Sequence, residues 1–103
     1  MEEASILLVE DVRVNAMVAA KLISTLGHKV EVALDGNDAI KKLQEDDYDV
    51  VFMDIEMPGL NGFEATRKIR SGAAGEKAED IPIFAMTAYT TREIHNESSE
   101  SGM

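Results

Sequence analysis

The sequence contains no cysteine, which excludes a disulfide framework and a thiolate metal site within this chain. It also lacks a long hydrophobic run: the first apolar stretch, residues 6–9, is short and follows an acidic start. A signal peptide needs a basic start and a longer apolar stretch, and a membrane-spanning helix needs about 20 apolar residues. We therefore expect a cytoplasmic protein that makes no membrane contact through this chain.

Basic residues are scarce, because 10 lysines and arginines stand against 20 acidic residues and leave a net charge of -10. Such a chain is a poor partner for nucleic acid and for anionic membranes. The acidity either serves solubility alone or gathers carboxylates around a cation, and composition does not distinguish the two. The length of 103 residues, with 45% hydrophobic and 29% charged residues, predicts one globular domain over residues 1–103.

Short apolar runs predict the strands of a sheet. Residues 6–9 and 50–53 are continuously apolar, which is typical of strands buried on both faces. Residues 81–86 form a further apolar run. Val30 and Val32 alternate with polar neighbours, which indicates a half-buried strand near a sheet edge.

Helical patterns separate these runs. Apolar residues recur at three- and four-residue steps over residues 14–26, and Gly27 follows at the position that favours a left-handed residue. Asn37 is the expected cap of a second helix, residues 63–69 suggest a third, and residues 71–80 form an expected polar surface loop. Alternating strands and helices predict an α/β fold, a parallel sheet wrapped on both faces by helices. The methionines are expected as core or loop filler, at positions 17, 53, 57 and 86.

Polar residues stand directly after the apolar runs. Glu10 and Asp11 follow the first, Asp54 follows the run at 50–53, and Thr87 follows the last. The carboxyl ends of parallel strands meet at one edge of a sheet, so these side chains are expected to converge. Taken singly, Glu10 and Asp11 could cap a helix, Asp54 could begin a turn, and Thr87 could be an ordinary strand residue.

The joint pattern favours a metal site over these separate roles. Carboxylates packed together repel one another, and one of them should have a raised pKa unless a cation neutralises the group. Ligands that are all oxygen, in an open and hydrated site, favour Mg²⁺ over zinc or copper.

Three blocks of the sequence resemble the signature of response-regulator receiver domains of two-component signalling. They are Ile6 to Asp11, Asp54 with Met57-Pro58 and Asn61-Gly62 after it, and Ala85 to Ala88. The resemblance covers the chain from Ser5 to Met103 and implies a flavodoxin-like doubly wound parallel sheet with strand order 2-1-3-4-(5). The segments around Asn15, residues 26–30 and residues 33–36 are similar to receivers attached to hybrid histidine kinases.

The resemblance also implies roles for individual residues. Asp54 would accept the phosphoryl group from the phosphohistidine of a histidine kinase or phosphotransfer domain. Asp11 would bind Mg²⁺ directly, Glu10 directly or through water, and the backbone carbonyl of Glu56 would supply a further ligand. Such a domain is a switch that catalyses its own phosphorylation and dephosphorylation, and not a conventional turnover enzyme.

Further positions would sense or tune the modification. The Thr87 hydroxyl would hydrogen-bond a phosphoryl oxygen, and the small Ala88 would leave room for the group. Tyr89 and the Glu56 side chain stand where the family often tunes dephosphorylation.

The sequence departs from the family pattern at its end. It stops at Glu100 to Met103, where the fifth strand of the family, with its terminal lysine, would begin. We expect the lost lysine to impair phosphoryl transfer. We expect the bare strand at 81–86 to lead to a dimer through that edge, to a rearranged C-terminus or to poor solubility. The alternative is a receiver-like interaction module that takes no phosphate. An aspartate-based phosphatase is disfavoured because Met57-Pro58 replaces the second aspartate and small hydroxyl residues of that class.

Overall fold

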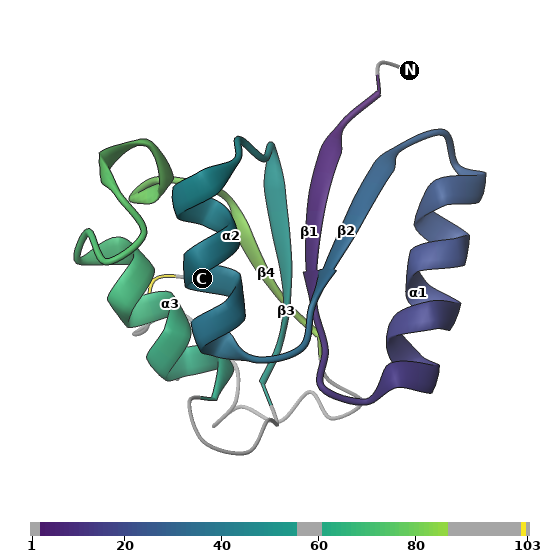
Figure 1. Cartoon of the computed structure of the whole chain (residues 1–103), viewed down its shortest axis with the longest axis horizontal. Coiled ribbons are helices and arrows are strands. Elements are labelled where there is room, and N and C mark those ends of the chain that lie inside the picture. The colour runs from purple at the N-terminus through teal and green to yellow at the C-terminus, as the bar shows by residue number, and fades with distance from the viewer. Residues whose placement is uncertain (1–2, 56–60, 87–101, 103) are drawn as a thin grey trace.

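The sheet has four parallel strands in the order β2-β1-β3-β4, which confirms the predicted order of the first four strands (Figure 1). The computed structural model describes residues 3–55, 61–86 and 102. The strands are β1 at Ser5–Val9, β2 at Lys29–Ala33, β3 at Val50–Asp54 and β4 at Ile83–Met86. The two expected fully apolar strands, β1 and β3, are adjacent at the centre, and the half-buried β2 lies at an edge as predicted.

Helices lie on both faces of the sheet, as the alternating pattern predicts. Helix α1 at Arg13–Thr25 covers one face, whereas α2 at Gly36–Glu45 and α3 at Gly62–Arg70 lie together on the other (Figure 1). No helix among the described residues is long and apolar enough to cross a membrane.

The main core lies between the sheet and the pair α2 and α3. Alternate strand residues point to the same face, so the odd positions of β1 and β3 turn toward these helices. Four strand side chains and four helix side chains interlock there with almost no exposed surface: Leu7, Val9, Val51, Met53, Ala39, Leu43, Ala65 and Ile69. The sheet is thereby held rigidly on one side, which fixes where its carboxyl edge lies.

The start of α2 differs from the prediction. Asp35, and not Asn37, is the N-cap, because its carboxylate accepts a hydrogen bond from the Asp38 N–H at 2.7 Å. Asp38 in turn accepts from the Leu34 N–H at 3.3 Å, so two backbone donors at the helix start are satisfied. Asn37 therefore lies within the first turn, and the two-residue error has a local cause in these two hydrogen bonds.

The segment predicted as a polar surface loop at 71–80 is partly buried. It contains a short 3₁₀ helix at Glu76–Ala78, and Ala74 and Ala78 belong to the main core. Arg70 holds the segment against α3, since its Nη1 donates to the Glu79 carbonyl at 2.8 Å. Ala74 and Ala78, four residues apart, are sufficient to bury part of this segment. Two small apolar residues among polar ones are too short a pattern to predict a helix.

Helix α1 forms where it was predicted, but its apolar residues do not enter a core. Ala16 is its only buried residue, and Met17, expected as core or loop filler, is 71% exposed. The helix ends as expected, because Gly27 follows with φ of +93°, in the left-handed region.

Candidate metal centre at the carboxyl edge of the sheet

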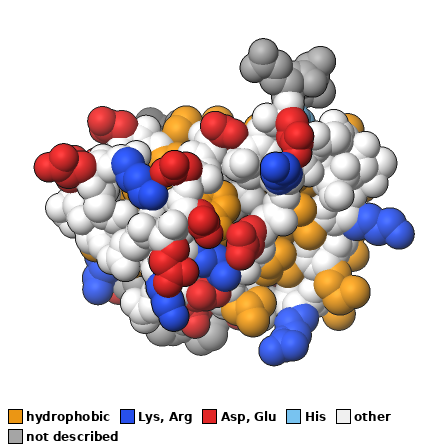
Figure 2. All heavy atoms as spheres, turned by 45° about the horizontal axis from the view of Figure 1, so that its top comes forward, with side chains coloured by type: hydrophobic (Ala, Val, Ile, Leu, Met, Phe, Trp, Pro, Cys, Tyr) orange, Lys and Arg blue, Asp and Glu red, His pale blue; other side chains and the backbone are white. Residues whose placement is uncertain are grey.

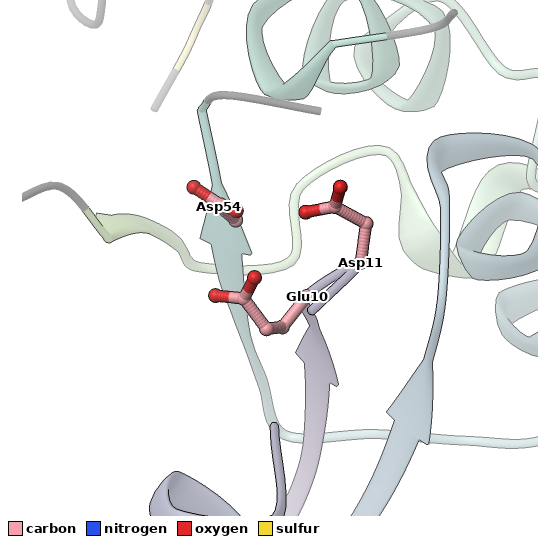
Figure 3. Close-up of side chains that lie close together, drawn as sticks. All are labelled: Glu10, Asp11 and Asp54. Atoms are coloured by element: carbon pink, nitrogen blue, oxygen red, sulfur yellow. The ribbon is translucent and has the colours of Figure 1, made fainter. Parts of the chain in front are cut away.

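Three carboxylates meet where β1 and β3 end. Glu10 and Asp11 directly follow β1, and Asp54 is the last residue of β3. The register pairs Val9 with Met53, so the residues after them lie side by side at the same edge. One carboxylate oxygen from each acid lies within 4.8 Å of the others (Figure 3). The predicted convergence of these three side chains is therefore present in the structure.

Glu10 is the most buried of the three, with 7% of its surface exposed. Its backbone N–H donates to the Ala33 carbonyl at 3.0 Å, which continues the pairing of β1 with β2 by one residue. Its carboxylate accepts a hydrogen bond from the Val12 N–H at 3.1 Å. The pKa of Glu10 is raised to about 7, chiefly by burial; the Val12 N–H bond opposes the rise, and the nearby Asp54 and Asp11 contribute to it.

Asp11 carries an oxygen that the described residues leave unsatisfied. Its Oδ1 is buried and has no hydrogen-bond partner there. A buried carboxylate oxygen without a partner is costly, and a bound cation removes that cost. All three groups offer oxygen only, which suits a hard divalent cation such as Mg²⁺. The residues at this edge therefore fit the predicted metal.

Neither acid after β1 serves as a helix cap, so that alternative is wrong. The N-cap of α1 is Val12, which has no side-chain capping bond, and the first turn of α1 contains no acidic residue. The bond from the Val12 N–H to Glu10 shapes the turn before the helix. The turn holds the Glu10 carboxylate beside Asp54 instead of over the α1 terminus (Figure 3).

Gly62 brings the start of α3 against the end of β3, a contact that the sequence analysis did not predict. Its N–H donates to the Ile55 carbonyl at 3.2 Å. A Cβ on residue 62 would lie 2.9 Å from the Ile55 Cα and closer still to the Asp54 carbonyl oxygen. Only glycine permits this approach, so Gly62 positions the backbone that carries Asp54. The Asn61-Gly62 pair in the sequence was a signal, but the sequence analysis used it only as part of the family resemblance.

The remaining predicted site residues lie outside the described part of the chain. These are Glu56, Thr87, Ala88 and Tyr89. Their predicted roles in metal binding, sensing and tuning therefore stay predictions.

Comparison with known proteins agrees with the fold. Residues 6–103 match the family described as the response regulator receiver domain. The chain belongs to this family. The match covers both the edge that carries the acids and all four strands.

Two curated proteins that are similar to this chain are a histidine kinase and a sensor protein. The rice protein named probable histidine kinase 4 is 40% identical over 117 residues, which cover 96% of this chain and 12% of that protein. The sensor protein EvgS of Escherichia coli K12 is 32% identical over 99% of this chain and 8% of its own length. The chain thus spans about an eighth or less of these two relatives.

Solved receiver structures have the same fold. The receiver domain of the sensor histidine kinase PA1611 from Pseudomonas aeruginosa, described with a magnesium ion in its active-site cleft, is 34% identical with a TM-score of 0.86. That comparison covers 99% of this chain and 81% of the other. The Mg²⁺-complexed receiver of the histidine kinase CKI1 from Arabidopsis thaliana is 28% identical, with a TM-score of 0.86 over 97% of this chain and 79% of the other.

Proposed function

We propose that this receiver domain accepts a phosphoryl group on Asp54, with Mg²⁺ bound at Glu10, Asp11 and Asp54. The observation that carries the proposal is the buried Asp11 Oδ1, which has no hydrogen-bond partner among the described residues, within a cluster of three carboxylates. Three carboxylates packed together are costly for stability, but they can bind a cation, and the bound cation can attract an incoming anion. The magnesium ion in the PA1611 receiver supports the choice of metal.

The proposed donor is a phosphohistidine of a histidine kinase or of a phosphotransfer domain. An Asp54 carboxylate oxygen attacks phosphorus, the phosphorus–nitrogen bond breaks, and its electron pair stays on the imidazole nitrogen. The products are an acyl phosphate on Asp54 and an unmodified histidine. A carboxylate is a weak nucleophile, so the protein contributes mainly by position.

The described residues supply that position in two ways. The end of β3, held by Gly62 and α3, fixes the backbone of Asp54. The turn after β1 holds Glu10 and Asp11 beside it, where their charge would repel a phosphoryl group in the absence of a cation. Mg²⁺, when bound by these acids, would offset that repulsion and stabilise the negative charge on the phosphoryl oxygens.

We further propose that the domain works within a hybrid histidine kinase pathway in the cytoplasm. The support is the histidine kinase names of the relatives, one of them the hybrid signal transduction histidine kinase L of Dictyostelium discoideum, 34% identical over 95% of this chain. The lack of nucleic-acid and membrane partners stays a prediction from the net charge of -10.

The test is a phosphorylation assay with a small-molecule phosphodonor such as acetyl phosphate, with and without Mg²⁺. We expect a mass increase of one phosphoryl group that requires Mg²⁺ and disappears in Asp54→Asn. Asp11→Asn should weaken Mg²⁺ binding at least tenfold, measured by calorimetry. Glu45→Gln removes an exposed acid from α2 and serves as the control.

The same assay distinguishes the alternative module that takes no phosphate. Mg²⁺ binding without phosphorylation under any donor would favour that module. Phosphorylation of the Asp54→Asn variant at the rate of the parent chain would refute Asp54 as the acceptor.

A further inference from the structure

Two side chains hold the chain where it enters β1, at the amino edge of the sheet and opposite the acidic cluster (Figure 1). The Nδ1 atom of His28 accepts a hydrogen bond from the Ala4 N–H at 3.0 Å. The Asp49 carboxylate accepts one from the Ser5 N–H at 2.7 Å. The carbonyl of Ala4 accepts from the Lys29 N–H at 2.9 Å, and that of Ser5 from the Asp49 N–H at 2.7 Å. Ala4 and Ser5 are therefore each bound through both of their backbone groups.

His28 stands where the hydrogen-bond ladder between β1 and β2 runs out of backbone acceptors. In a parallel pair, a residue accepts from one N–H of its neighbour strand and donates to the carbonyl two positions earlier on that strand. Because Lys29 donates to Ala4, the regular acceptor for the Ala4 N–H would be the carbonyl of residue 27, which lies in the turn after α1. The imidazole of His28 takes the place of that carbonyl. A ladder acceptor that cannot titrate is thereby replaced by one that can.

The bond to Ala4 requires a neutral His28. Nδ1 accepts only while it carries no proton, so the single ring proton lies on Nε2. A second proton turns Nδ1 into a donor that faces the Ala4 N–H, and the hydrogen bond is lost. Histidine ordinarily changes charge between about pH 5 and 8, whereas an aspartate does so at more acidic pH. Of the two side chains that hold this edge, His28 is therefore the one that responds near neutral pH.

A cavity beside His28 offers the protonated ring another position. Its volume is about 580 Å³, and it lies between the turn after α1 and the loop before β3. Helix α1 contributes the uncharged Ser24. Figure 2, which turns the top of Figure 1 toward the viewer, shows many acidic side chains on this side of the molecule. The titratable side chains that line the cavity besides His28 are one base, one phenol and three acids: Lys29, Tyr48, Glu31, Asp46 and Asp47.

Most of these charges already have partners. Lys29 lies 4.0 Å from Glu3, the acid that precedes Ala4. Glu31 pairs with Lys42 at 3.4 Å and accepts from the Tyr48 hydroxyl at 3.1 Å. Asp47 pairs with Lys77 at 2.9 Å. Among the described residues that line the cavity, Asp46 is left as the carboxylate without an ion pair, so it is the natural partner for an imidazolium.

We propose that His28 is a pH-sensitive switch that fastens the chain to the amino edge of the sheet. The neutral ring holds the Ala4 N–H. The protonated ring, having taken its proton from solvent, releases Ala4 and turns into the cavity toward Asp46. Acidification thereby loosens the residues before Ser5, while Asp49 keeps Ser5 in place. The switch lies at the edge of the sheet opposite the metal centre and does not depend on phosphoryl acceptance.

Exchange of the Ala4 amide hydrogen with water, measured by NMR on the metal-free chain between about pH 5 and 8, tests the proposal. After division by the intrinsic exchange rate at each pH, the protection of Ala4 should fall about fivefold as His28 gains its second proton, the effect of one lost hydrogen bond. The Ser5 amide should keep its protection. The ring nitrogen shifts of His28 should show Nδ1 without a proton at the basic end of the range.

His28→Asn is the matched variant, because its Oδ1 is attached to Cγ as Nδ1 is, and it accepts a hydrogen bond at any pH in this range. Protection of Ala4 should then be independent of pH. The variant retains Glu10, whose pKa of about 7 lies in the same range at the other end of β1, and so separates the two titrations. His95→Asn, which removes the other histidine of the chain, should behave as the parent.

Three results would overturn the proposal. The first is a proton on Nδ1 of the neutral ring, a measurement that needs no variant. The second is a loss of Ala4 protection on acidification that is equal in the parent and in His28→Asn, since another group would then be responsible. The third is an Ala4 protection that stays constant in the parent while His28 titrates.

Discussion

Replacing Glu10 by glutamine isolates the electrostatic cost of the acidic cluster. Glutamine keeps the shape of the side chain and retains an oxygen that accepts from the Val12 N–H, but it carries no charge. In the metal-free chain the pKa of Glu10 rises from 4.5 to about 7. A difference of about 2.5 pH units, at about 1.4 kcal/mol each, corresponds to roughly 3 kcal/mol. The nearby Asp54 shares part of that cost, so we expect on the order of 2 kcal/mol.

The sign follows from proton linkage. The folded chain holds the Glu10 proton more tightly than the unfolded chain, so the folded state is penalised when that proton leaves. The penalty is absent below about pH 4.5, grows between pH 4.5 and about 7, and is complete above about 7. Glu10→Gln should therefore be nearly neutral below pH 4.5 and stabilise the metal-free chain by on the order of 2 kcal/mol at pH 8.

Urea denaturation in the presence of EDTA at several pH values between 4.5 and 8 measures this difference. The exposed Glu45→Gln on α2 is the control, and its effect should not follow the same pH profile. Saturating Mg²⁺ should reverse the order at pH 8, because the metal stabilises the parent chain and the variant has lost a ligand. A Glu10→Gln effect that is constant from pH 4.5 to 8 without metal would refute the reasoning.

Three further predictions concern the fold that supports the site. Gly62→Ala should lower the free energy of unfolding by roughly 1–3 kcal/mol, because the added methyl group collides with the backbone of Asp54 and Ile55. This net loss already includes a gain of up to about 1 kcal/mol in helix propensity. The variant should also bind Mg²⁺ more weakly in calorimetry. Gly27→Ala meets no atom within 4 Å but strains a φ of +93°, so it should destabilise by about 1 kcal/mol with Mg²⁺ affinity intact. Leu43→Ala, in the main core, should cost about 2–5 kcal/mol in urea denaturation, and a loss under 1 kcal/mol would contradict its burial.

Much of the fold follows from the sequence because each element has a local pattern. Continuous apolar runs mark the central strands, alternation marks the edge strand β2, and the order of strands and helices leaves few topologies for a parallel sheet. The position of Glu10, Asp11 and Asp54 at strand ends then implies that they meet, because parallel strands end at a common edge. The pKa of one acid of the group is raised as expected, although burial contributes more to the rise than repulsion between the carboxylates.

The helix start at Asp35 and the outward face of α1 were not predictable in the same way. Asp35 and Asn37 are equally good caps by residue type, and the bonds that Asp38 makes with Asp35 and with the Leu34 N–H decide between them. An apolar helix face indicates contact with something apolar, but periodicity does not say whether that partner lies within the described fold.

The type and order of the elements, and the chemistry of the residues that follow each strand, could be predicted from the sequence because both depend on neighbours along the chain. Only the tertiary fold makes Glu10 the acid with the raised pKa, brings Gly62 and the start of α3 against Asp54, and turns Val18 of α1 outward. Burial and close approach are set by residues distant in sequence, through the register of β1 and β3 and the packing of helices on the sheet.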